Sequence, residues 1–60
     1  MNHDTYHQLL QEVNTFKSEF ERFSDKSIKV AGTRARKSLN EIKKLSLNLR
    51  REILDHQKTL

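Results

Sequence analysis

Basic side chains in the second half of the chain recur at a spacing that could bind phosphate groups. Seven residues make nearly two turns of an α-helix, so bases seven apart fall in one row along a helix. Each phosphate that such a row neutralises releases counterions, and Arg adds a bidentate grip on phosphate oxygens. The spacing predicts two neighbouring rows on a surface for a polyanion, formed by Lys29, Arg36, Lys43 and Arg50 and by Lys37, Lys44, Arg51 and Lys58.

The charge is distributed unevenly along the 60 residues. Positions 1 to 27 contain three bases and five acids, a formal charge of −2, whereas positions 28 to 60 contain nine bases and three acids, a charge of +6. The outer face of any amphipathic helix also carries solubilising charges, and Glu41, Glu52 and Asp55 offer ordinary ion pairs at helical spacing. A solvated face therefore stays an alternative explanation of the basic rows.

The elements that would position these bases are two amphipathic helices. We expect them over residues 4–23 and 27–56, with a reversal in Ser24-Asp25-Lys26-Ser27, whose side chains can satisfy free backbone amides. The fold class is all-α, an antiparallel helical hairpin in a single domain over residues 1–60. Its two apolar stripes recur at intervals of three and four, as Tyr6, Leu9, Val13, Phe16, Phe20 and Phe23 and as Ile28, Ala31, Ala35, Leu39, Ile42, Leu45, Leu49 and Ile53.

A chain of this length buries only about 60% of the surface that its unfolded form exposes. Cysteine is absent, so no disulfide can add the missing stability. We therefore expect a homodimer or higher homo-oligomer that stacks two hairpins into a four-helix arrangement. Leu47 and Leu54 fall on the basic side of the second helix, where they fit either a partner contact or ordinary exposure.

Catalysis, cofactors and membranes are not expected. The sequence has no glycine-rich phosphate loop, and it is too short to enclose a pocket for a small-molecule substrate. His3 and His7 are four residues apart, but no further ligand completes a metal site. No apolar run approaches the roughly 20 residues of a membrane span, and no signal peptide is recognisable. We expect a cytoplasmic protein that is not an enzyme and binds no cofactor or metal.

The only glycine, Gly32, lies in the interior of the second predicted helix, where glycine costs about 1 kcal/mol relative to alanine. Close approach of a DNA backbone would justify this cost, with Thr33 as a hydroxyl donor beside Arg34 and Arg36. Packing of an aromatic ring of the first helix, Phe20 or Phe23, would justify it equally well. Both explanations stay open.

The same segment resembles a known family. The residues that match are Asp25-Lys26-Ser27, Val30-Ala31-Gly32-Thr33-Arg34-Ala35-Arg36-Lys37 and Leu39-Asn40-Glu41-Ile42-Lys43-Lys44-Leu45. They are similar to the bacterial linker-histone-like DNA-binding proteins of the histone-like, Hc-one type. The resemblance implies a nucleoid-associated protein that binds and compacts double-stranded DNA with little sequence preference. Together with the charge pattern it predicts a DNA-binding set of Thr33, Arg34, Arg36, Lys37, Lys43, Lys44, Arg50 and Arg51.

A function of another class remains open beside DNA binding. The hairpin could be a helical protein–protein interaction module, which docks an amphipathic or acidic partner on the same basic side. The two leucines on that side, Leu47 and Leu54, are the feature that favours this alternative. Nucleic acid that copurifies with the protein would distinguish DNA binding from it.

Overall fold

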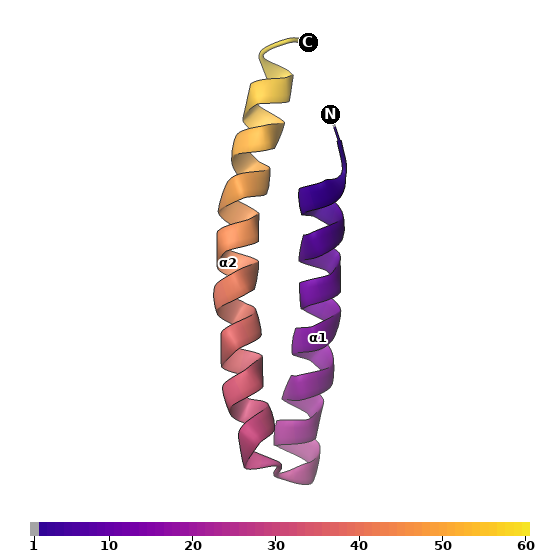
Figure 1. Ribbon diagram of the computed structural model, residues 1–60, viewed down its shortest axis with the longest axis vertical. Coiled ribbons are helices and arrows are strands. Elements are labelled where there is room, and N and C mark those ends of the chain that lie inside the picture. The colour runs from indigo at the N-terminus through magenta and orange to yellow at the C-terminus, as the bar shows by residue number, and fades with distance from the viewer. Residues whose placement is uncertain (1) are drawn as a thin grey trace.

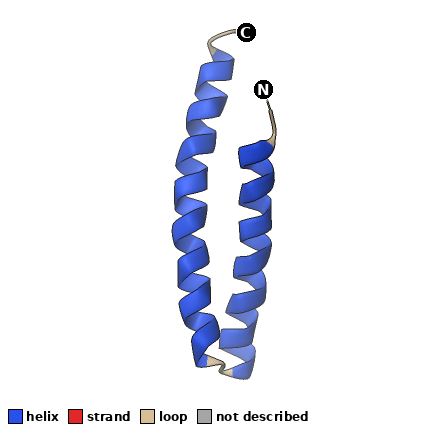
Figure 2. Cartoon of the chain, viewed as in Figure 1, coloured by secondary structure: helices blue, strands red, loops and turns tan. Residues whose placement is uncertain are grey.

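The computed structural model describes residues 2–60 as two helices joined by a turn of two residues. Helix α1 spans Asp4–Lys26 and helix α2 spans Lys29–Gln57. The helices run antiparallel, so that the two ends of the chain lie at the same end of a rod of 48 × 14 × 13 Å (Figure 1). The described residues contain no strand (Figure 2). The predicted all-α antiparallel hairpin is confirmed.

The turn lies later in the chain than the sequence predicted. Ser24 Oγ donates a hydrogen bond to Asp25 Oδ1 at 2.9 Å, and both residues remain in α1. The chain reverses at Ser27, whose φ of 55° and ψ of 36° are left-handed. The amides of Ser27 and Ile28 both donate to the carbonyl of Arg22, which closes the end of α1. The bounds 4–23 and 27–56 are therefore corrected to 4–26 and 29–57.

Small residues of α2 bring the helices together near the turn. Ala31, Ala35 and Ser38 are the buried residues of α2, and Ala31 is fully buried. These residues form the seam, the line of side chains along which the two helices pack. Ser38 was not predicted to lie in this seam, because a polar residue does not contribute to an apolar period. Further from the turn, half-buried residues with the same spacing continue the seam, namely Ile42, Leu45 and Leu49.

Much of the predicted core lies at the surface of the single hairpin. On α1, Leu9 and Phe16 are half-buried, but Tyr6, Val13 and Phe20 are exposed, with Phe20 at 49%. These three residues are seven apart and form a row beside the seam, where a single neighbouring helix does not cover them. An apolar face results, which we define as Tyr6, Val13, Phe20, Phe23, Leu39 and Ile53.

Gly32 packs against the ring of Phe23. A Cβ atom added at Gly32 would lie 2.7 Å from Cδ1 and 2.9 Å from Cε1 of Phe23, well inside ordinary contact. Gly32 has no positive φ, so its backbone conformation does not require glycine. Of the two explanations for Gly32, the structure favours close packing of the helices.

A hydrogen bond connects the helices at the open end of the hairpin. Thr5 Oγ1 donates to Glu52 Oε2 at 2.5 Å. The N-terminus of α1 is stabilised beside it, because the amide of Asp4 donates to Asn2 Oδ1 at 3.2 Å. The rod is thus held by a tight turn at one end and by side-chain polar contacts at the other.

Candidate nucleic-acid interface

The basic residues of α2 lie mainly on the side turned away from α1. The buried residues Ala31, Ala35 and Ser38 mark the side that contacts α1, and residues two positions before or after a seam residue point away from it. All eight bases at the seven-residue spacing are exposed. We name them the first basic row, Lys29, Arg36, Lys43 and Arg50, and the second basic row, Lys37, Lys44, Arg51 and Lys58.

The two basic rows follow one continuous helix. At about 1.5 Å per residue, the distance from Lys29 to Lys58, the residue that caps α2, is roughly 43 Å, which exceeds one turn of duplex DNA at about 34–36 Å. Most of this helix is supported by α1, so the spacing of the cations is set before any ligand arrives. Such an array can contact several phosphates of one duplex at once.

A third row lies between the two basic rows, and we name it the middle row. It consists of Thr33, Asn40, Leu47 and Leu54, again seven residues apart and all exposed. The two leucines are 54% and 53% exposed. Thr33 was predicted among the DNA-binding residues, whereas Asn40 was not. Counting in sevens from Thr33 would have found it.

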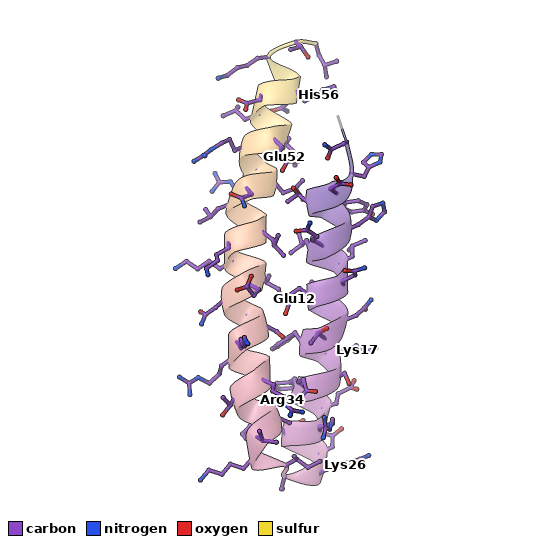
Figure 3. All side chains as sticks on the ribbon, viewed as in Figure 1. Glu12, Lys17, Lys26, Arg34, Glu52 and His56 are labelled. Carbon is purple, nitrogen blue, oxygen red and sulfur yellow. The ribbon has the colours of Figure 1, made fainter. Side chains whose placement is uncertain are left out.

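Arg34 is the one member of the predicted DNA-binding set that lies apart from these rows. It lines a groove of about 400 Å³ beside the seam, together with three acids and three other polar or basic residues. Figure 3 shows Arg34 between the two helices, on the side of α2 near α1. We name this side the polar face, formed by Glu12, Thr15, Glu19, Arg34, Lys37, Ser38 and Glu41.

Ion pairs occupy little of the basic surface. Lys44 Nζ lies 3.7 Å from Glu41 Oε1, and both side chains are well exposed, so the pair contributes little. Among residues 2–60, no other base of the two rows is in an ion pair. The second ion pair lies on α1, where Arg22 Nη1 donates to Glu19 Oε1 at 3.1 Å. The cations of α2 are therefore available to an external anion.

Two histidines and a tyrosine cluster near the start of the described part of the chain. The rings of His3 and His7 lie 6.1 Å apart and each contacts Tyr6. No group of three or more His, Asp or Glu residues there could hold a metal ion. Neither helix is long and apolar enough to cross a membrane.

Comparison with known proteins identifies the family. The family model described as histone H1-like protein Hc1 matches residues 3–59, a range that includes both helices, the turn and both basic rows. Neither the curated proteins nor the solved structures contain a significant match. Because the match covers nearly the whole chain, the protein belongs to the histone H1-like Hc1 family.

Proposed function

We propose that the protein binds double-stranded DNA through the phosphate backbone and compacts it in a bacterial nucleoid. The observation that carries this proposal is the pair of basic rows on the outer side of α2, which are exposed and nearly free of ion pairs. Membership of a histone H1-like family supports the same ligand. The binding residues are Thr33, Arg36, Lys37, Lys43, Lys44, Arg50 and Arg51, with Arg34 contributing less from the polar face.

Binding of this kind is electrostatic and must weaken with salt. The logarithm of the affinity should fall linearly with the logarithm of the salt concentration, with a slope of about −0.9 per phosphate contact. We would measure affinity by fluorescence anisotropy for duplexes of equal length and unrelated sequence, across a salt series. A slope corresponding to several contacts is the expected result.

A matched pair of double variants tests whether binding depends on the basic rows or only on the net charge of the protein. Arg36→Ala/Lys43→Ala removes two cations of the first basic row, and should reduce the slope by about 1.8, the value for two contacts. Lys17→Ala/Lys26→Ala removes the same charge from α1 (Figure 3) and should leave the slope nearly unchanged. Equal slopes for both variants, or no binding by the parent at low salt, would overturn the proposal and direct the search to a protein partner.

A homodimer would supply two pairs of basic rows, which would allow one assembly to contact more DNA than a single hairpin does. The hairpin exposes 5057 Å², whereas a compact protein of 7.2 kDa exposes about 4100 Å². The excess of about 900 Å² is close to the 800 Å² that each partner buries in a standard interface. The apolar face is the surface that we expect a second copy to cover, because no large side chain of residues 2–60 is fully buried in the single hairpin.

The dimer is tested by molar mass in solution. Sedimentation equilibrium should give about twice 7.2 kDa for the parent. Phe20→Glu places a charge in the apolar face and should give the monomer, while Thr15→Glu places the same charge on the polar face and should keep the dimer. A monomeric parent, or dissociation by Thr15→Glu as complete as by Phe20→Glu, would contradict this part of the proposal.

A further inference from the structure

The middle row is chemically different from the two rows that flank it. Its first two members, Thr33 and Asn40, can donate and accept hydrogen bonds, and its last two, Leu47 and Leu54, are apolar. All four are exposed on the side of α2 opposite the seam. Neither the packing of the hairpin nor the binding of phosphate requires leucines at positions surrounded by cations.

The positions of the cations limit what these leucines can contact. Leu47, Ile53 and Leu54 share a shallow groove of about 450 Å³ with Arg50 and Arg51. Lys43 and Lys44 precede Leu47 by a single helical turn. An apolar protein surface that covered the leucines would bring these cations close to it and remove water from them, at a considerable free-energy cost. A ligand that carries anions on both sides of an apolar or hydrogen-bonding strip fits the arrangement better.

The major groove of DNA has this arrangement. It is about 12 Å wide and admits an α-helix, with phosphates along both rims and base edges on its floor. On that floor adenine presents an acceptor and a donor that Asn contacts in a bidentate manner, and thymine presents a methyl group that apolar side chains contact. The middle row therefore offers groups for both members of an A·T pair.

We propose that α2 lies in the major groove of A·T-rich DNA, with the middle row on the base edges and the two basic rows on the phosphates of either rim. Asn40 reads adenine and Leu47 contacts thymine methyl groups. Residues seven apart on α2 are separated by about 10 Å, which corresponds to about three base pairs. This inference rests on the proposed function and adds to it a base preference and the element that reads it.

The first experiment compares A·T-rich and G·C-rich duplexes of equal length at one salt concentration. The parent should bind the A·T-rich duplex about tenfold more tightly, the discrimination expected from one good base contact. Asn40→Ala should remove most of this preference while keeping the salt slope. Asn48→Ala is the matched control, because Asn48 is exposed on α2 but lies outside the middle row.

Modified bases identify the groove and the contacts. Replacing thymine by uracil removes the methyl group and leaves every phosphate in place, so it should weaken binding of the parent but not of Leu47→Ala/Leu54→Ala. Inosine·cytosine pairs combine the major groove of G·C with a minor groove like that of A·T, and we expect this duplex to bind as weakly as the G·C-rich one.

The outcomes that overturn the inference differ from those that overturn DNA binding. Salt-dependent binding with equal affinity for A·T-rich, G·C-rich and uracil-containing duplexes refutes the base reading and leaves phosphate binding intact. Strong binding of the inosine duplex places the contact in the minor groove and refutes the proposed docking. If the leucine variant keeps the methyl-group discrimination but loses self-association, Leu47 and Leu54 belong to a protein contact instead. Absence of salt-dependent binding to every duplex refutes the proposed function itself.

Discussion

The contact between Gly32 and Phe23 gives a prediction in which helix propensity and packing have opposite signs. In an open helix, Gly32→Ala would stabilise by about 1 kcal/mol. Here the new Cβ would lie 2.7 Å from Phe23 Cδ1, so the ring must move by about 0.7 Å to restore a contact of 3.4 Å. Overpacking of this kind costs about 1–3 kcal/mol. We expect Gly32→Ala to reduce the free energy of unfolding by up to about 2 kcal/mol.

A double-mutant cycle isolates the packing contribution. In the Phe23→Ala background the obstacle is gone, and the same Gly32→Ala substitution should raise the free energy of unfolding by about 1 kcal/mol. The coupling between the two positions should then be about 1–3 kcal/mol. Urea unfolding followed by far-ultraviolet circular dichroism would measure it, at one protein concentration because association also contributes. Asn48→Ala controls for helix propensity at an exposed position of α2. Equal stabilisation by Gly32→Ala in both backgrounds would refute the packing explanation of the glycine.

Three further predictions concern the turn and the charged residues. Ser27→Gly relieves the strain of the left-handed conformation at residue 27 and should raise the free energy of unfolding by about 0.5–1 kcal/mol, as measured by urea unfolding. A lower free energy of unfolding would show that the hydroxyl of Ser27 is needed. Glu19→Leu removes a carboxylate whose Oε2 is buried without a hydrogen-bond partner, and thermal unfolding should show a free energy of unfolding raised by up to about 1 kcal/mol. A clearly lower free energy of unfolding would mean that the ion pair of Glu19 with Arg22 dominates. Lys44→Ala removes one cation of the second basic row and should weaken DNA binding and reduce the salt slope by about 0.9, whereas an unchanged slope would exclude Lys44 from the interface.

The helices were predictable because their period is repeated in every turn, whereas the reversal was predicted only to within a segment that includes Ser27. Ser24 and Asp25 are favourable capping residues, but in the structure they hydrogen-bond to each other inside α1. The reversal instead uses Ser27 in a left-handed conformation, for which glycine is the usual signal. A serine at this position gives no indication that distinguishes it from its neighbours in the sequence.

The predicted core was less accurate than the predicted helices. Intervals of three and four assign the residues of the predicted core to one stripe on each helix, but two helices alone cover only the seam positions. Tyr6, Val13 and Phe20 fall one position beside that seam and remain exposed, while Ser38 is buried in it. Which of two adjacent rows faces the partner helix depends on the crossing of the helices, and the sequence pattern does not contain that information.

The candidate site could be read from spacing but not from proximity in the sequence. The interval of seven residues predicted both basic rows, and in the structure their members are exposed on the outer side of α2. Arg34 and Arg36 are close in the motif, yet two residues correspond to about 200° around a helix, and Arg34 lies on the polar face. A motif read along the chain therefore joins residues that the helix separates.

The two-residue turn also has a consequence for the order in which the chain folds. Contacts beside the turn close very short loops, whereas Thr5 and Glu52 are 47 residues apart, and the entropy cost of closure rises with loop length. Formation of the hairpin should begin where Phe23 meets Gly32 and proceed towards the open end, as a zipper closes. Substitutions at Gly32 should then slow folding, while Thr5→Ala should mainly accelerate unfolding. The cations nearest the turn, such as Arg36, would be in place before those at the far end of α2.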